Sequence, residues 1–366
     1  MKITMLSPFS SKGATTGRLY ELAKNMDSAT RIIIPKSDKY GRSKEDELFL
    51  FTLEKKSFLL LLLHVYRALK YLRGEKPQVV YFAKPHLFTF LPALLYKIMQ
   101  PDCSLVFDCD EWDPATLRDN EENFYKVWLT DFLAYLSIRL SDYVVYSNTW
   151  IREEKIPRKY WGKCFYLSNG VDTKEFRVRE RKRGKEFSLM FVGLLHKIKH
   201  ILPIIDAVEI AANQIPELKC YIVGDGPKRK ELEEIIASKG LSRFFVFKGT
   251  VAHEKLPELL PTANLLIAPF SDIEGVRYQS NVKIFEYMAV GVPIIATDVG
   301  DIKRILGGGK AGYVVSPGNP KAIAEKIIYI RQNPVKSKAC ASLARKLAVD
   351  MYDWKVLAQK LENFLG

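Results

Sequence analysis

The feature that most constrains the fold of this 366-residue chain is an alternation of short apolar runs with longer helical patterns. The alternation occurs twice, on either side of RVRERKRGK at 177–185, which is highly charged and has no apolar periodicity. Such alternation is typical of parallel sheets covered by helices on both faces. We therefore predict two α/β domains joined by a basic linker, and the chain is long enough for two separate cores.

The predicted strands form one group for each domain. In the first half they are 2–7, 30–34, 78–83, 104–108 and 143–147. In the second half they are 188–192, 219–223, 244–248, 265–268, 293–297 and 312–315. The segment 337–365 is helical by pattern. The predicted domains are 1–176 and 186–349, with the linker 177–185 between them and a C-terminal helix, 350–366, that packs back on the first domain.

Composition excludes several classes of protein. A formal net charge of +14 favours polyanions of any kind, but no zinc-finger, RNP-like or helix-turn-helix signature accompanies it, so we expect no nucleic-acid partner. The five cysteines form no CxxC pair and lack clustered histidines, which predicts reduced thiols and no metal site. The first apolar run is too short for a secretory signal and no run reaches the ~20 residues of a membrane span, so we expect a cytoplasmic protein.

Two patterns in the first half could bind ligands. The loop after the first strand, FSSKGATTGRLYELA, contains Gly13 and Gly17 and opens a helix near Thr16. Glycines allow close backbone approach and helix amides attract phosphate, although a tight strand-to-helix turn explains these residues equally well.

The fourth predicted strand ends in VFDCDEWDP, which crowds four acids at the edge where open α/β sheets bind ligands. Asp108, Asp110, Glu111 and Asp113 could accept hydrogen bonds from sugar hydroxyls or hold a proton. Alternatively, Asp113 caps a helix and the other acids are simply exposed to solvent.

The second half is more informative. One predicted strand ends at Gly193 and is followed by Lys197, Lys199 and His200, and the next ends at Gly224 in YIVGDGP. Two successive strands that end in glycine at one sheet edge leave a flat surface on which a nucleotide can lie.

A third element, SNVKIFEYMAVGVPIIATDVG, predicts a helix whose first amides lie near 280–282. Those amides and Lys283 suit a diphosphate, whereas the Glu286 carboxylate suits both hydroxyls of a ribose.

Together these elements resemble the retaining glycosyltransferases of family 4, which have the GT-B fold: two Rossmann-like domains facing each other across a cleft. The resemblance covers essentially the whole chain. The motifs that carry it are NGVD at 169–172 with Phe176, FVG at 191–193 with Lys199 six positions on, VGDGP at 223–227 and FEYMAVGVPIIATDVG at 285–300.

The resemblance implies roles for individual residues. Lys199 would contact the donor diphosphate, Glu286 would hold the ribose and backbone groups near Val251 would contact the base. The implied donor-binding residues are Gly13, Gly193, Gly224, Val251, Tyr278, Ser280, Asn281, Val282, Lys283 and Glu286. The implied catalytic residues are Lys199, Asp110 and Glu286.

Three positions depart from the family pattern. Leu194 replaces an arginine, Tyr278 stands in the place of the first glutamate of a pair, with Glu274 as a candidate substitute, and Asp110 stands where a histidine is common. The first two departures favour, as an alternative, a catalytically silent relative that binds nucleotide sugars.

The implied activity is transfer, with retention and without metal or cofactor, of a hexose-type sugar from a UDP- or GDP-linked donor to a glycan or lipid-linked acceptor. The leaving diphosphate would take the acceptor's proton, and Asp110 would bind sugar or acceptor or stabilise positive charge at the sugar carbon. The alternatives are a catalytically silent nucleotide-sugar-binding relative and a GT-B sugar-nucleotide 2-epimerase.

The helical segments 57–72 and 86–99 are unusually apolar, and the first carries Arg67 and Lys70. An apolar surface flanked by cations is typical of enzymes that sit on anionic lipid, which makes a peripheral contact with the inner face of the cell membrane a hypothesis. The alternative is that both helices simply cover the first sheet.

Overall fold

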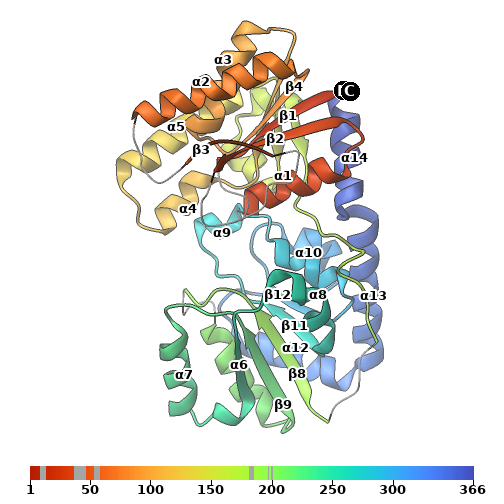
Figure 1. Ribbon diagram of the computed structural model, residues 1–366. Helices are drawn as coiled ribbons and strands as arrows, with labels where there is room; N and C mark the ends of the chain where they lie inside the picture. Colours follow the sequence, from red (N-terminus) through yellow and green to blue (C-terminus); the bar gives the residue numbers. More distant parts are fainter. Residues whose placement is uncertain (9–13, 37–46, 53–57, 181–184, 197, 199–200) are drawn as a thin grey trace. The chain divides into compact units, whose positions relative to one another are not determined.

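In the computed structural model the chain forms two compact units (Figure 1), and the structure describes residues 1–8, 14–36, 47–52, 58–180, 185–196, 198 and 201–366. Unit 1 comprises Met1–Asn169, Arg277–Ser280 and Trp354–Gly366, and unit 2 comprises Gly170–Val276 and Asn281–Asp353. Residues 170–176, predicted in the first domain, belong instead to unit 2. Phe176 is buried in the core of unit 2 and Val171 forms a β-bridge with Asp353.

Unit 1 is built on a seven-stranded parallel sheet with the strand order β3-β2-β1-β4-β5-β6-β7. Its strands are β1 (Lys2–Leu6), β2 (Ala29–Lys36), β3 (Glu47–Thr52), β4 (Val79–Ala83), β5 (Ser104–Cys109), β6 (Tyr143–Tyr146) and β7 (Cys164–Tyr166). β4 and β5 are almost fully buried, as expected for the central strands of a sheet covered on both faces.

The helices of unit 1 are α1 (Ala14–Asn25), α2 (Phe58–Glu75), α3 (Leu87–Met99), α4 (Asp113–Asp119), α5 (Phe124–Leu140) and α14 (Trp354–Leu365). α2, α3 and α5 pack on one face of the sheet, where side chains such as Phe82 and Phe107 point. α1 and α14 cover the other face, with Met5 and Tyr81. Alternate residues of each strand therefore supply two separate cores.

Unit 2 contains a six-stranded parallel sheet with the order β10-β9-β8-β11-β12-β13. Its strands are β8 (Phe187–Val192), β9 (Leu218–Val223), β10 (Phe245–Gly249), β11 (Leu265–Ala268), β12 (Ile294–Thr297) and β13 (Tyr313–Val315). The strand order reverses between β8 and β11, and such a switch point is where open α/β sheets bind ligands.

The helices of unit 2 are α6 (Leu202–Ala212), α7 (Arg229–Ser238), α8 (Leu256–Leu259), α9 (Glu274–Arg277, whose last residue belongs to unit 1), α10 (Val282–Ala289), α11 (Ile302–Ile305), α12 (Pro320–Gln332) and α13 (Pro334–Met351). α6, α7 and α12 contribute to the core on one face of the sheet, and α8, α10 and α13 to the core on the other.

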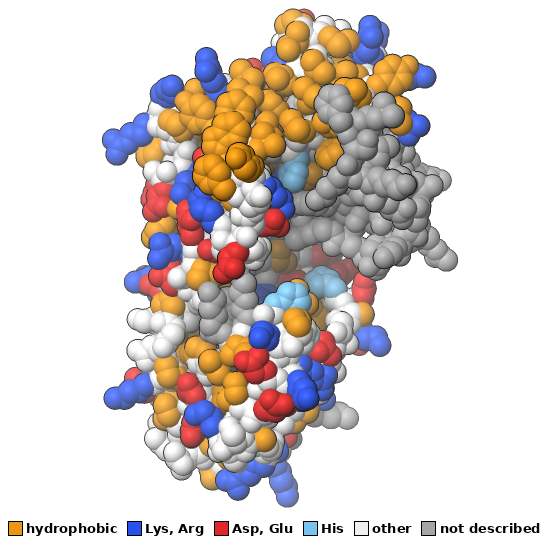
Figure 2. All heavy atoms as spheres, turned by 90° about the vertical axis from the view of Figure 1, so that its left-hand side faces the viewer, with side chains coloured by type: hydrophobic (Ala, Val, Ile, Leu, Met, Phe, Trp, Pro, Cys, Tyr) orange, Lys and Arg blue, Asp and Glu red, His pale blue; other side chains and the backbone are white. Residues whose placement is uncertain are grey.

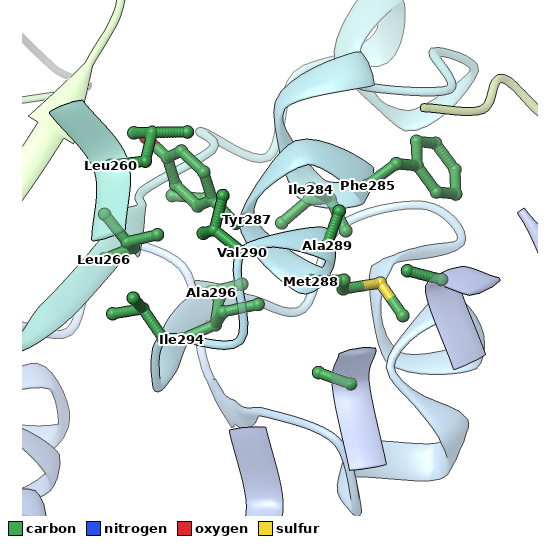
Figure 3. Packing of buried hydrophobic residues seen from close by; sticks show 14 of the residues in the cluster. Leu260, Leu266, Ile284, Phe285, Tyr287, Met288, Ala289, Val290, Ile294 and Ala296 are labelled. Carbon is green, nitrogen blue, oxygen red and sulfur yellow. The ribbon is translucent and has the colours of Figure 1, made fainter. Parts of the chain in front are cut away.

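α10 is buried along most of its length (Figure 3), with Tyr287 directed toward Leu260 and Phe285 directed away from it. Six consecutive residues of this helix, 284–289, are buried, so its position in the core is tightly fixed.

Short 3-10 turns complete the chain at 158–163, 242–244, 253–255, 260–262 and 307–309, with a π-helical turn at 151–155. None of the helices in the described ranges has the length and apolar character that crossing a membrane would require.

Three features of the fold differ from the prediction. β3 and β7 are edge strands that the apolar pattern did not reveal; β7 has only three residues, all half-buried. The predicted final helix is two helices, α13 and α14, separated at Tyr352 and Asp353. Asp353 accepts hydrogen bonds from the backbone and hydroxyl of Thr173, which fixes the break.

A buried ion pair holds the carboxyl edge of the unit 1 sheet together. Nε of Arg18 on α1 lies 2.9 Å from Oδ2 of Asp108 on β5, and both side chains are almost inaccessible to solvent. The guanidinium also donates to the carbonyl oxygens of Leu167 and Ser168 at 2.8 and 2.7 Å. Burial lowers the pKa of Arg18, but Asp108, together with Tyr81 and Asp110, raises the pKa overall. One side chain thus ties together α1, β5 and the segment after β7.

We expect Arg18→Leu to lower the unfolding free energy of unit 1 by about 3–5 kcal/mol, because Asp108 is then buried without its partner. All five tryptophans lie in unit 1, so urea unfolding followed by tryptophan fluorescence reports on this unit. Lys24→Ala, on the exposed side of the same helix, is the matched control and should change stability by less than about 0.5 kcal/mol. Equal effects of the two variants would contradict the role of the ion pair.

Candidate functional site

The glycines predicted to lie beneath a bound nucleotide are at the carboxyl ends of β8 and β9. Gly193 donates from its backbone N–H to the carbonyl of Val223 at 2.9 Å, and Gly224 donates to that of Gly249 at 2.8 Å. Gly224 has φ +133°, and a Cβ there would lie 2.0 Å from the carbonyl oxygen of Gly193. The two turns pack backbone against backbone, so glycine is required at 224 by the fold itself.

The end of β8 is held by two side chains from α10. Nζ of Lys283 donates to the carbonyl of Val192 at 2.9 Å, and the hydroxyl of Tyr287 accepts from the N–H of the same residue at 3.2 Å. β11 pairs with β8 only at Leu189 and Met190. Beyond that point, the side chains of α10 satisfy the backbone groups of Val192.

Lys283 combines a cationic group with an apolar setting. Its ammonium lies 5.0 Å from the centre of the Phe191 ring and 5.6 Å from that of Phe270. Burial lowers the pKa of Lys283 to about 8, against the opposing effect of the Glu286 carboxylate. An anion placed beside this ammonium would raise its pKa again and would be bound more strongly because water is partly excluded.

Glu286 lies on the same helix, one turn from Lys283 at the level of the strand ends. Its side chain is buried, and Oε1 lies 2.7 Å from Nε2 of His253, which is largely exposed. The hydrogen bond to Glu286 is the main cause of a raised His253 pKa, with Glu254 and Glu175 adding to it. His253 was missed in the sequence, although it lies only two residues after Val251.

The remaining predicted donor residues of unit 2 lie near these groups along the chain. Asn281 is the N-cap residue of α10 with an extended backbone, and Val282 begins the helix; both are half-buried. Val251 is half-buried and packs against the core that includes α10. Leu194, which stands in place of an arginine, is 72% exposed. Helix amides, Lys283 and Glu286 thus share α10, and the turns after β8 and β9 complete the candidate site.

Two predicted donor residues, Tyr278 and Ser280, belong to unit 1. Tyr278 is 2% exposed, packs in the unit 1 core and donates its hydroxyl to Oε2 of Glu154 at 2.6 Å. The Tyr278 side chain is thus packed inside unit 1, and the donor contact predicted for it stays a prediction. The hydroxyl of Ser280 accepts from the N–H of Asn169 at 3.0 Å, and its carbonyl accepts from the Asn169 side chain at 2.6 Å.

Asp110 in unit 1 belongs to a buried cluster of charges. Nζ of Lys84, directly after β4, lies 3.2 Å from Asp110 Oδ1, 3.1 Å from Asp113 Oδ1 and in contact with Glu111. Oδ2 of Asp110 accepts from the hydroxyl of Thr15 at 2.9 Å. The four predicted acids thus divide between two cations, since Asp108 pairs with Arg18.

The charged groups in this cluster shift one another's pKa values. Burial lowers the pKa of Lys84, but Asp110, Asp113 and Glu111 together raise it well above its ordinary value. Burial raises the pKa of Asp113 to about 7 in spite of Lys84. Lys84 was not singled out in the sequence, although it directly follows a strand beside the one that carries the acids. Lys84, which is held among these carboxylates, orients Asp110 toward the sheet edge at which α1 begins.

Gly13 and Lys199, together with Lys197 and His200, lie outside the described residues, so their predicted roles remain predictions. Within the described part of the chain, no group of three or more His, Cys, Asp or Glu side chains is placed to hold a metal ion.

Comparison with known proteins relates the second unit to a family. Residues 172–347 match the model of the family described as glycosyl transferases group 1. The chain is 24% identical over 218 residues to an alpha-D-kanosaminyltransferase from Streptomyces kanamyceticus, which covers 57% of this chain and 55% of that protein. It is 26% identical over 215 residues to a GDP-mannose-dependent alpha-(1-6)-phosphatidylinositol monomannoside mannosyltransferase from Mycobacterium tuberculosis, covering 55% of each. The chain spans about half the length of these curated relatives.

Solved structures match the chain over its full length. A sucrose-phosphate synthase from Thermosynechococcus elongatus superposes with a TM-score of 0.79 at 16% identity, covering 100% of this chain and 98% of that one. Anabaena HepE in complex with UDP-glucose gives 0.75 at 18% identity, covering 100% and 99%. These likenesses confirm the predicted fold class, the GT-B fold with two Rossmann-like domains.

We expect Gly224→Ala to destabilise unit 2 more than Gly240→Ala. Both residues have positive φ, but only Gly224 would bring a Cβ against another backbone; Gly240 has open space around it. Backbone strain alone should cost about 1–3 kcal/mol at Gly240. Differential scanning calorimetry should show a clearly larger loss for Gly224→Ala, and similar losses would show that the close approach is easily relaxed.

We expect Glu286→Gln to lower the pKa of His253 toward its ordinary value of about 6.5, because the main group that favours the imidazolium is removed. Proton NMR titration of the imidazole resonances measures this directly. His64 and His86, whose pKa values burial lowers to about 4, serve as internal controls and should not move. An unchanged His253 pKa in the variant would show that the contact with Glu286 does not form in solution.

Proposed function

We propose that this protein is a glycosyltransferase that moves a hexose-type sugar from a nucleotide diphosphate sugar, with retention of anomeric configuration, to a glycan or lipid-linked acceptor. The observation that carries the proposal is the pairing of Lys283 and Glu286 on a buried helix that binds the end of β8 at the switch point of its sheet. The family match over 172–347 includes this helix and supports the same class of enzyme.

In the proposed donor site, each described group has one task. The first amides of α10 and the ammonium of Lys283 bind the diphosphate, and Glu286 accepts hydrogen bonds from the ribose hydroxyls. His253 holds Oε1 of Glu286, which leaves Oε2 for the donor. Backbone groups near Val251 contact the base. Because Lys283 is partly desolvated, its charge is more effective toward the diphosphate than that of an exposed lysine.

Catalysis would consist mainly of stabilising the leaving diphosphate and positioning the acceptor. Lys283 supplies positive charge from the described residues, and Lys199 is proposed as the second phosphate contact. The diphosphate itself takes the acceptor's proton on the face from which it leaves, so the scheme has no step that needs a metal. Asp110, oriented by Lys84 and Thr15, is proposed to bind sugar or acceptor hydroxyls.

The class of donor and acceptor is supported by what the relatives' names state. Related chains are named as kanosaminyl and mannosyl transferases, one of them GDP-mannose-dependent and acting on a phosphatidylinositol monomannoside. Structural neighbours include complexes with UDP and UDP-glucose. A UDP- or GDP-linked hexose draws on both sets, whereas the glycan or lipid-linked acceptor draws on the relatives' names alone.

A catalytically silent sugar-nucleotide binder is the second candidate, because two family positions are altered. Leu194 is exposed where an arginine is common, and Tyr278 is buried where a glutamate is common. Such a protein would bind nucleotide without turnover, so binding and turnover have to be measured separately.

We expect one nucleotide among UDP, GDP and ADP, with their common sugar conjugates, to raise the melting temperature by roughly 5–10 °C at hundredfold excess over its Kd. Glu286→Gln should weaken that binding about tenfold or more, because charged hydrogen bonds to the ribose are lost. Glu258→Gln, an exposed glutamate of the same unit, is the matched control.

Turnover is then followed by NMR with the conjugate that binds. Release of nucleotide with an unchanged anomeric configuration in the product, and without loss in EDTA, is the expected result. Binding without turnover would favour the silent relative, an inverted anomer would overturn retention, and no binding by any conjugate would overturn the donor site.

A further inference from the structure

Helix α5 leaves an unusual surface uncovered on unit 1. Its buried residues are Leu133, Ala134, Ser137 and Ile138, all in the second half of the helix. All nine residues 124–132 are exposed or half-buried, and six of these nine are large apolar or aromatic side chains or valine. A helix that only covered a sheet would present polar residues here.

The exposed side chains of α5 are mainly aromatic. Phe124 and Tyr125 are 74% and 76% exposed, Trp128 is 58% exposed and Phe132 is 50% exposed. Phe124, Trp128, Phe132 and Tyr135 recur every three or four residues, so they form one stripe along the helix. The rings of Trp128 and Phe132 stack with centroids 5.9 Å apart. The stripe is therefore a continuous aromatic face.

The aromatic face continues onto neighbouring helices of unit 1. α3 contacts both α2 and α5, and exposed side chains at their surfaces include Tyr66 of α2 and Ile98 of α3. Twelve of the twenty large hydrophobic side chains exposed among the described residues lie on these three helices. Figure 2 shows hydrophobic side chains gathered on this side of the molecule, with charged side chains of both signs at the border. A patch of this kind on a folded protein marks an interaction surface.

The composition of the patch indicates what it contacts. Phe, Trp and Tyr place an apolar body and, for the last two, a polar tip at a membrane–water boundary. The three helices carry six Lys and Arg residues against two acidic ones, Glu75 and Asp131. Two of the six, Lys97 and Lys126, are ion-paired with acids outside the helices, Asp142 and Glu122. Basic side chains beside an aromatic face match the negative charge of an anionic bilayer, and each adds attraction near such a surface.

We propose that the aromatic face of α5, with the adjoining surfaces of α2 and α3, docks unit 1 on the surface of an anionic lipid bilayer. The sequence pattern had drawn attention to 57–72 and 86–99, but much of those helices faces the sheet: Ala68, Leu72, Phe90 and Ala93 are all core residues. The contact surface centres instead on α5, where the rings are free of the core. Docking would hold the enzyme where lipid-linked molecules are concentrated.

The test is flotation of the full chain with vesicles of phosphatidylcholine alone and of phosphatidylcholine mixed with phosphatidylglycerol. Wild-type protein should float with the mixed vesicles only. Its tryptophan emission should shift to the blue, because Trp128 moves from water into the lipid surface. Trp128→Ser combined with Phe132→Ser should reduce the bound fraction at least about tenfold, because two large apolar side chains are lost from the contact.

Val335→Ser combined with Val349→Ser removes two exposed apolar side chains from α13 of unit 2 and is the matched control, expected to bind vesicles as the wild type does. The α5 variant should keep its nucleotide-induced thermal shift. A loss of vesicle binding can then be assigned to the α5 surface and not to damage of the donor site. Equal capture by neutral and mixed vesicles, or equal capture of the wild type and the α5 variant, would overturn the proposal. A concentration-dependent dimer in sedimentation, lost in the α5 variant and without vesicle binding, would assign the face to a second copy of the chain.

Discussion

The peptide groups of Val192 are the point on which the candidate site of unit 2 depends. At the end of β8 the ladder with β11 has stopped, and two side chains from α10 bind the N–H and C=O that remain. Because α10 is itself enclosed by apolar contacts, this bonding fixes the helix relative to the sheet within narrow limits. The glycine turns after β8 and β9, the amides at the start of α10 and the Glu286 carboxylate all take their positions from this one junction.

Unit 1 stabilises the same edge of its sheet by a different physical means. There the strand ends are joined by buried ions: Arg18 binds Asp108 and two carbonyls, and Lys84 is surrounded by Asp110, Glu111 and Asp113. Buried charges are tolerated only when they are paired, so removing any member is costly, whereas the apolar contacts that surround α10 tolerate small changes of volume. The two units therefore share an architecture while their strand-end edges differ in electrostatic character.

The sequence predicted the architecture well and the details of side-chain placement less well. Buried strands such as β8 and β11 are short apolar runs bounded by turn residues, which makes them visible without a structure. β7 was not predicted, because its three half-buried residues show no periodic pattern of apolar side chains. Glu286 and Lys283 were predicted because a helix fixes their spacing, while His253 reaches Glu286 from a segment 33 residues earlier, a contact that only the folded chain defines. That Tyr278 packs in the core of unit 1 could not be predicted, because position along the chain does not reveal which unit a short segment packs against.

The path of the chain through the two units has a consequence for synthesis. Unit 2 is one region interrupted only by four residues, and it is complete once Asp353 has been made. Unit 1, although the ribosome produces most of it first, still lacks Leu357 and Leu361 of α14, which fill one of its two cores. Domains generally fold in the order in which they emerge. In this chain the first unit to appear is the last to be finished, and a nascent chain stalled before residue 354 would expose the apolar face of α1 to the cell's chaperones.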